Sequence, residues 1–291
     1  MRPAEEGMLL LCSTLSEPGA QPLSGAEFQA LREKLAGQLP QEDPLQELTQ
    51  GMLLRAGLSE QEAGRVLALL SRGERLSAYL AAAQRQGMSL VTRISPGYPA
   101  RLRAGLGDDA PPVLYCKGDP ALLSRPALSV VGARHVSAEG RRTAQRLGAF
   151  AAEHGLALCS GGANGADLAA QEACLRAGGT VVSFPATRLL DLPADGRVLY
   201  AVEDGFGAGF SAGRALHRNR LIHAFGLAAA AIEPQPGRGG TWSGSVYNLA
   251  HGLSPLFVSD DGSAGAQALL RRGARPLPEL AAFLRNMPQD V

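Results

Sequence analysis

The stretch that decides the fold is LALCSGGANGADLAAQEACLRA, residues 156–177. It begins with a short apolar run, passes through a glycine-rich loop and ends in a longer segment that Gly178 closes. An apolar run followed by a glycine turn and a segment of helical length is typical of a buried parallel strand that leads into a helix. The stretch therefore predicts one strand–loop–helix unit of a parallel α/β sheet.

The same alternation of apolar runs and helical segments continues on both sides of this unit. Further strands are predicted at residues 127–131, 180–184, 227–233 and 255–259. Ser137 is placed to cap the helix after the first of them, and helices are expected over residues 213–225 and 241–251. The glycine-rich stretch 184–213 predicts no regular element. We expect an α/β protein with an extended Rossmann-like, doubly wound and mostly parallel sheet.

The N-terminal part has a different pattern, of short helices separated by turns. Ser24 and Ser59 are placed as helix N-caps, and Glu62 completes a capping box with Ser59. Strand and turn signals begin at Met88. We therefore expect a small helical N-terminal domain, residues 1–87, and a Rossmann-like domain, residues 88–291. The sequence does not indicate what the helical domain does.

Composition sets limits on the class of protein. The 291 residues are 45% hydrophobic and 19% charged, as in ordinary globular proteins. The formal net charge is only +1, so any affinity for nucleic acid has to come from a local patch. There is no apolar run of membrane-spanning length and no basic secretory start, so we expect a cytoplasmic protein without a membrane partner. The four cysteines form no CxxC pair, which predicts neither a metal site nor a disulfide framework.

Three loops are expected at one edge of the sheet. They are Gly132 to Arg134, Ser160 to Asp167, and Gly237 to Thr241, and each lies between a strand and a helix. Glycine lets backbone N–H groups approach an anion, and a helix N-terminus adds unpaired N–H groups. A single loop of this kind needs no ligand, because a tight turn requires glycine by itself. Three of them together with nearby arginines favour phosphate binding, although none has the GxGxxG or P-loop pattern.

The segment Arg218-Asn219-Arg220 lies shortly before the strand at 227–233. We predict that its two arginines reach outward to phosphates and that Asn219 holds a loop in place. The following apolar pair, Leu221 and Ile222, is predicted to anchor the helix against the sheet.

In this order, VVGAR, SGGANGAD, HRNRLIHAFGLAAAAIE and GGT resemble the motifs of the DprA (Smf, DNA-processing protein A) family, over about residues 88–258. The resemblance implies a single-stranded DNA-binding protein that protects the strand, forms a homodimer and assists loading of a RecA-type recombinase during DNA uptake or recombination. It implies no enzymatic activity and no cofactor. The chain departs from the family at Ala133, where a serine or threonine is usual. It ends soon after a short helix expected at about 278–286, so we expect a divergent member without the C-terminal winged-helix domain.

The loops and the resemblance together give a set of candidate residues that bind DNA or phosphate. They are Gly132, Arg134, Ser160, Gly161, Asn164, Gly165, Asp167, His217, Arg218, Asn219, Arg220, Gly240 and Thr241. His217 either contacts phosphate or is solvated, and its residue type does not decide between the two. Asp167 is expected to cap its helix or orient an arginine. No catalytic residue and no metal ligand is expected among them.

Other functions stay open at this point. LOG-type phosphoribohydrolases have a PGG-x-GT-x-x-E loop, to which PGRGGTWSG is similar, but the glutamate position is Gly244 here. A nucleotide-binding sensor of the same broad fold needs no such carboxylate. A protein–protein adaptor is a third alternative.

Overall fold

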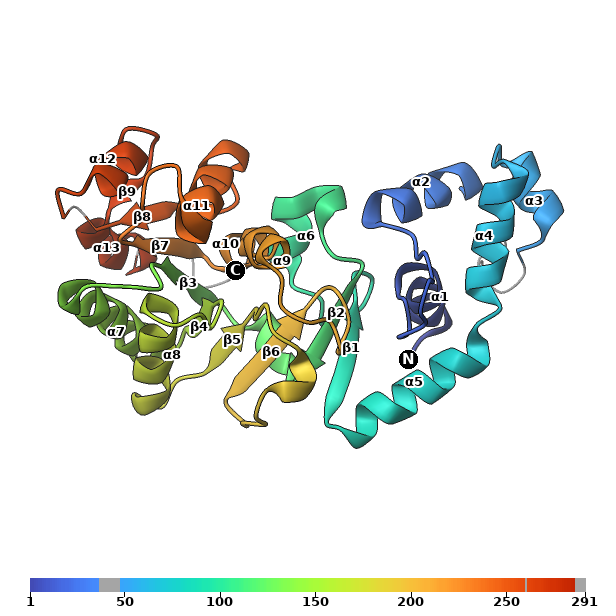
Figure 1. The fold of residues 1–291 in the computed structure, drawn as a ribbon, viewed down its shortest axis with the longest axis horizontal. Coiled ribbons are helices and arrows are strands. Elements are labelled where there is room, and N and C mark those ends of the chain that lie inside the picture. The colour runs from blue at the N-terminus through green and yellow to red at the C-terminus, as the bar shows by residue number, and fades with distance from the viewer. Residues whose placement is uncertain (37–47, 260, 286–291) are drawn as a thin grey trace.

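The computed structural model describes residues 1–36, 48–259 and 261–285. These residues form one nine-stranded sheet in the order β1-β2-β6-β5-β4-β3-β7-β8-β9, which runs through the middle of an elongated molecule (Figure 1). The strands are β1 (Met88–Thr92), β2 (Val113–Lys117), β3 (Ala127–Gly132), β4 (Ala157–Ser160), β5 (Val181–Ser183), β6 (Val198–Val202), β7 (Ala228–Ile232), β8 (Leu256–Val258) and β9 (Arg275–Pro276).

Helices cover both faces of this sheet. The α-helices of the described residues are α1 (Pro3–Cys12), α2 (Gly25–Leu35), α3 (Gln50–Arg55), α4 (Glu60–Leu70), α5 (Gly73–Arg85), α6 (Ala100–Leu106), α7 (Ala138–Glu153), α8 (Ala166–Arg176), α9 (Ala212–His217), α10 (Asn219–Phe225), α11 (Gly239–His251), α12 (Ala264–Leu270) and α13 (Leu280–Arg285). Short 3-10 turns are η1 (Gly107–Asp109), η2 (Pro120–Ser124), η3 (Leu189–Asp191) and η4 (Leu277–Glu279). None of the helices in the described part of the chain combines the length and the apolar character needed to cross a membrane.

The sheet is mostly parallel, which confirms the expected fold class. Every pairing from β6 through β5, β4, β3, β7 and β8 to β9 is parallel, whereas β1 and β2 pair antiparallel at the other end. The strands β4 and β7 lie on opposite sides of β3. The chain therefore leaves β3 and β7 in opposite directions, and this reversal of strand order is where open α/β sheets bind their ligands.

Two apolar layers enclose the parallel strands. The helices α7, α8 and α13 pack on one face, against residues such as Leu128 and Leu158, while α6, α10, α11 and α12 pack on the other. Ser137 caps α7 as predicted, since its hydroxyl accepts a hydrogen bond from the Gly140 N–H. Close packing of α7 on α8 requires Gly148, where an added Cβ would lie 2.1 Å from the Ala170 carbonyl oxygen.

The N-terminal helices pack on the antiparallel end of the sheet, at the right of Figure 1. Alternation along β2 explains this: Val113 and Tyr115 face the helices, while Leu114 and Cys116 face the core beneath α6. The Tyr115 hydroxyl donates to the hydroxyl of Ser13, just after α1, at 2.6 Å. Because helices and strands share one apolar core, the division into domains 1–87 and 88–291 stays a proposal.

The structure differs from the sequence-based expectation in several places. The helix α12 and the strand β9 lie where no element was predicted. The run VLYAV forms β6 inside the stretch 184–213, where no regular element was predicted, and pairs with β5 and β2. Its glycine-rich surroundings concealed a short apolar run that the sheet needs to join its parallel and antiparallel parts. The single helix expected at 213–225 is two helices, α9 and α10, which meet at Arg218. The final helix ends at Arg285, and residue 286 lies outside the described residues.

Candidate functional site

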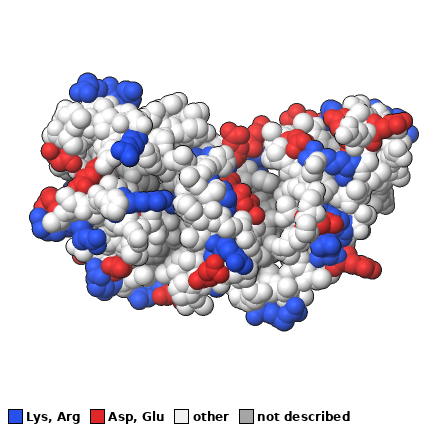
Figure 2. Space-filling view, viewed as in Figure 1, with Lys and Arg blue, Asp and Glu red and all other residues white. Residues whose placement is uncertain are grey.

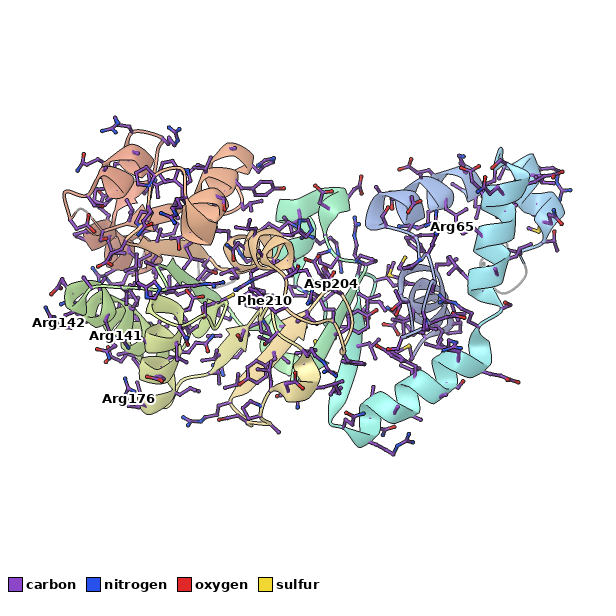
Figure 3. All side chains as sticks on the ribbon, in the orientation of Figure 1. Arg65, Arg141, Arg142, Arg176, Asp204 and Phe210 are labelled. Carbon is purple, nitrogen blue, oxygen red and sulfur yellow. The ribbon has the colours of Figure 1, made fainter. Side chains whose placement is uncertain are left out.

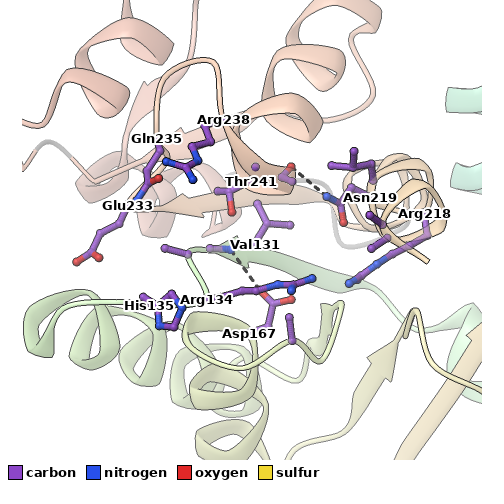
Figure 4. Close-up of a pocket in the computed structure, with 18 residues that line it drawn as sticks. Val131, Arg134, His135, Asp167, Arg218, Asn219, Glu233, Gln235, Arg238 and Thr241 are labelled. Atoms are coloured by element: carbon purple, nitrogen blue, oxygen red, sulfur yellow. Dashed lines mark hydrogen bonds between the residues drawn. The ribbon is translucent and has the colours of Figure 1, made fainter. Parts of the chain in front are cut away.

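A pocket of about 680 Å³ lies at the reversal of strand order (Figure 4). We call it the switch-point pocket. Gly132 at the end of β3 is paired with Ile232 at the end of β7, so the loops after these strands begin side by side. The pocket is lined by Val131, Gly132, Ala133, Arg134, His135, Ala163, Asp167, Ala212, Ala215, Leu216, Arg218, Asn219, Glu233, Gln235, Arg238, Gly239, Gly240 and Thr241. The three predicted loops thus converge on one cavity, together with α9.

The loops after β3 and β4 interlock. The Ala166 N–H donates to the Ala133 carbonyl at 3.2 Å. Gly165 has a φ of +96°, and a Cβ there would lie 2.3 Å from the same carbonyl, so only glycine fits. The Asp167 carboxylate accepts from the Gly132 N–H at 3.2 Å and from the Gly161 N–H at 3.1 Å. Asp167 therefore fixes both loops from below.

The environment of Asp167 sets its electrostatics. Burial raises the pKa of this carboxyl, and the positive charge of Arg218 together with the backbone N–H groups opposes the rise. Both oxygens already accept hydrogen bonds from backbone amides. These contacts indicate that Asp167 holds the loops after β3 and β4 in place.

Arg218 lines the pocket and carries buried side-chain nitrogens that lack hydrogen-bond partners among the described residues. Its guanidinium lies against Gly161, where an added Cβ would be 1.5 Å from Nη1. Its Nε and Nη1 atoms are buried and have no hydrogen-bond partner among the described residues. Burial lowers the pKa of Arg218, and Asp167 opposes this. A buried cation with free donors is costly, so an anion in the pocket would be strongly favoured.

The predictions that Asn219 holds a loop and that Leu221 and Ile222 anchor the helix are confirmed. The Asn219 side-chain amide donates to the Gly240 carbonyl at 3.0 Å and so holds the third loop. Leu221 and Ile222 are completely buried against the sheet.

The prediction that Arg220 reaches outward is wrong. Its side chain is only 9% exposed and forms an ion pair of 2.5 Å with Glu203, just after β6. Its Nε also donates to His217 Nε2 at 3.1 Å. The strand β6 was not foreseen, and with it the carboxylate that turns Arg220 inward.

The remaining candidates divide into two groups. Arg134, Gly132, Gly240 and Thr241 line the pocket. Ser160, Gly161, Asn164, Gly165, His217 and Arg220 are not among the lining residues. The Ser160 hydroxyl, for example, is buried and accepts from the Gln171 amide at 2.7 Å.

Several lining or neighbouring residues were missed. Arg238 lies in the third loop, and its position between glycines was a usable signal. Phe210 is 58% exposed and lies near the middle of the view in Figure 3. The Arg134 guanidinium lies over its ring, 6.0 Å from the ring centroid. Leu216 is 49% exposed at the pocket wall. Phe210 and Leu216 belong to no periodic pattern that would have indicated their exposure.

Glu233 is the second carboxylate at the pocket. It closes β7 with a φ of +48° and accepts from the Ser137 N–H at 2.9 Å and from the Ser137 hydroxyl. It therefore caps the start of α7. Basic and acidic side chains are interspersed over the molecular face in Figure 2, so the arginines of the pocket act as a local group.

Comparison with known proteins identifies the family of the chain. Residues 89–288 match the sequence profile of the family described as DNA recombination-mediator protein A. The chain belongs to the DprA family. It is 33% identical over 216 residues to a putative DNA processing protein DprA of Mycobacterium tuberculosis, a match that covers 65% of this chain and 55% of the relative. The chain thus matches little more than half the length of that curated DprA protein.

Solved DprA structures show the same fold. The X-ray structure of DprA from Streptococcus pneumoniae has a TM-score of 0.74 and 21% identity, and the match covers 99% of both chains. A DprA structure from Helicobacter pylori has a TM-score of 0.55 and 25% identity, covering 68% of this chain and 94% of that one. The work on the Helicobacter pylori protein concerns its single-stranded DNA binding mode.

Proposed function

We propose that this DprA-family protein binds single-stranded DNA in the switch-point pocket and acts as a non-enzymatic recombination mediator. The observation that carries the proposal is the guanidinium of Arg218, whose buried Nε and Nη1 atoms have no hydrogen-bond partner among the described residues. A phosphate group supplies oxygen acceptors and negative charge together. Family membership supports the same ligand.

The geometry suggests where a phosphate would sit. The amides of Gly132 and Gly161 already donate to Asp167, so they are not available. The start of α11 is different, because its N-cap residue Arg238 makes no side-chain cap hydrogen bond. The first N–H groups of this helix, at Gly239 and Gly240, lie at the pocket and suit an anion. Arg218 would hold the phosphate from the opposite wall.

Aromatic stacking would supply the second part of the binding energy. Phe210 is exposed beside Arg134, and a base stacked on such a ring contributes about 1–3 kcal/mol. Binding through phosphates and ring faces is largely independent of sequence. A homodimer and delivery of the coated strand to a RecA-type recombinase are the further parts of this proposal, and they rest on family membership.

The test is fluorescence anisotropy of a labelled oligo-dT, titrated with protein at several salt concentrations, with duplex DNA as competitor. Each lost phosphate contact should reduce the salt slope by about 0.7. We expect Arg134→Ala and Arg218→Ala to weaken binding roughly tenfold or more each, since charged hydrogen bonds contribute about 1.5–3 kcal/mol. The matched control is Arg141→Ala, an exposed arginine of α7 at the outer edge of Figure 3. Equal affinity of wild type and both pocket variants would refute the proposal.

A nucleotide sensor or LOG-like hydrolase is the alternative, and pocket size is the observation that favours it. A volume of about 680 Å³ lies within the usual range for small-molecule sites. The hydrolase form is disfavoured, because Asp167 and Glu233 both accept hydrogen bonds from the backbone. Free mononucleotides added as competitors in the same titration decide the point, since a nucleotide protein binds them tightly and binds oligo-dT no better.

A further inference from the structure

A second pocket, of about 440 Å³, lies away from the switch-point pocket, between α2 and the segment that links β1 to α6. We call it the α2 pocket. It is lined by Met8, Gly25, Phe28, Gln29, Arg32, Arg93, Ile94, Arg103 and Pro112. Helices α2 and α6 face each other above β1 and β2 in Figure 1. No residue of this pocket belongs to the proposed DNA site.

The charge of the α2 pocket is one-sided. Three of the lining residues are arginines, and none of the described residues that line it is acidic. Arg93 pairs with Asp108 at 3.3 Å, a carboxylate that is itself 65% exposed. Arg103 donates one N–H to the Arg93 carbonyl at 2.8 Å, which fixes its side chain and leaves further donors. Arg32 approaches from α2 and contacts the Gln29 side chain. An anion would find arginines on two walls.

The remainder of the lining is apolar. Met8 and Phe28 are buried beneath it, while Ile94 and Pro112 are half-buried and present apolar surface. The half-buried amide of Gln29 donates to the Glu33 carboxylate at 3.2 Å and accepts from Arg32 at 3.3 Å, so it helps to hold Arg32 at the pocket. Cationic forks beside apolar surface suit a ligand with a phosphate at one end and a flat, weakly polar body at the other.

The walls of the α2 pocket are fixed in position. The first residue of α2, Gly25, is so close to η1 that an added Cβ would lie 2.7 Å from the Asp108 carbonyl oxygen. The Arg2 guanidinium donates to the Ile94 carbonyl at 2.6 Å. These two contacts to backbone carbonyls hold α2 and the segment after β1 in place, so a ligand has little ordering of the chain to impose.

We propose that the α2 pocket binds a nucleoside monophosphate group, with Arg32 and Arg103 on the phosphate and the base against Ile94 and Pro112. The group is either a free nucleotide or one unit of a DNA strand, which offer the same chemistry. Arginine forks recognise phosphate oxygens in pairs, and the apolar wall distinguishes a nucleotide from inorganic phosphate. The site does not depend on the switch-point pocket.

The first experiment is calorimetric titration of the full chain with dAMP and, separately, with inorganic phosphate. The protein carries Arg134→Ala and Arg218→Ala, so that the switch-point pocket is silenced. We expect dAMP to bind at least tenfold more tightly than phosphate. Adding Arg32→Ala and Arg103→Ala should weaken dAMP binding at least tenfold, whereas Arg85→Ala, an exposed arginine of α5, should leave it unchanged. Failure of dAMP to bind, equal binding of phosphate, or equal binding after the double substitution would each overturn the proposal.

The second experiment distinguishes the two sources of the nucleotide group. An oligonucleotide that contains 5-iodouracil is photocrosslinked to the wild-type chain, and the crosslinked peptides are identified by mass spectrometry. Crosslinks within residues 28–32 or 93–112 support a strand unit in the α2 pocket. Crosslinks confined to the switch-point loops, together with the dAMP binding above, support a free nucleotide. If dAMP binds here while oligo-dT fails to bind the switch-point pocket, the proposal for the α2 pocket survives and the proposed DNA site does not.

Discussion

Two arginines of the α9–α10 segment lie in opposite surroundings, Arg218 at the pocket and Arg220 in the core. Arg218 lies at the switch-point pocket with two buried nitrogens unpartnered among the described residues. Arg220, two positions later, is buried and forms an ion pair of 2.5 Å with Glu203. Residues two apart in a helical segment point to different sides, so one short motif supplies both environments.

The difference separates binding from stability. Two buried nitrogens of Arg218 have no hydrogen-bond partner among the described residues and can be satisfied by a ligand. Removing this arginine breaks none of the ion pairs among the described residues, although Asp167 loses the positive charge that opposes its raised pKa. An arginine in a buried pair is needed to keep its partner neutralised, and its removal leaves a carboxylate alone in the core. Replacing Arg218 should therefore lower the affinity for DNA, whereas replacing Arg220 should lower the stability of the fold.

The largest effect is expected from Arg220→Ala. It should lower the free energy of unfolding by about 3–5 kcal/mol, because Glu203 loses its buried partner. Urea denaturation followed by circular dichroism measures this. Arg214→Ala is the matched control, since it breaks a more exposed pair with Asp204 on the same segment and should cost about 1 kcal/mol or less. If Arg220→Ala keeps the stability of the wild type but loses affinity for DNA, Arg220 serves binding and the stability role given to it is wrong.

A somewhat smaller effect concerns His223, on the core side of α10. Burial lowers its pKa to about 4 from the ordinary 6.5. The unfolded chain therefore binds a proton more readily between these values, so stability is complete above about pH 6.5 and falls as the pH drops toward 4. The total loss is on the order of 3 kcal/mol.

The measurement for His223 is urea denaturation at a series of pH values. His223→Asn should flatten the decline between pH 6.5 and 4, because an amide stays neutral and can still accept from Asn248, which now contacts the ring at 3.1 Å. His154→Asn, an exposed histidine at the end of α7, should keep the slope of the wild type. Identical slopes in wild type and His223→Asn would show that this ring does not control acid stability.

The comparison also shows what the sequence could predict. Apolar runs such as 127–131 and 227–233 predicted the parallel strands, because strands buried on both faces have few polar residues. Convergence of the glycine loops followed from topology alone, since carboxyl ends of parallel strands share an edge. The prediction that Asn219 holds a loop in place is confirmed by its hydrogen bond to the Gly240 carbonyl.

The parts that were missed depend on contacts distant in sequence. The inward turn of Arg220 requires Glu203, which follows a strand hidden among glycines. The exposure of Phe210 depends on how an aperiodic stretch crosses the pocket. The α2 pocket lies where α2 packs beside residues 93–112, and no local sequence pattern predicts that packing. Local patterns indicated the strands and the edge of the site, whereas the partner of each arginine was set by tertiary packing.

The smallest effect tests whether Arg218 acts by its position or merely by its charge. In Gly161→Ala the new Cβ would lie 1.5 Å from the present position of Arg218 Nη1, so the flexible guanidinium must move while every charge is retained. If position matters, affinity for oligo-dT should fall by about tenfold, equivalent to roughly 1.4 kcal/mol, with little change in stability. Gly213→Ala is the matched control, because a Cβ on that α9 glycine meets nothing within 4 Å. Unchanged affinity in Gly161→Ala, beside a clear loss in Arg218→Ala, would mean that the pocket needs the charge of Arg218 but not the place that Gly161 gives it.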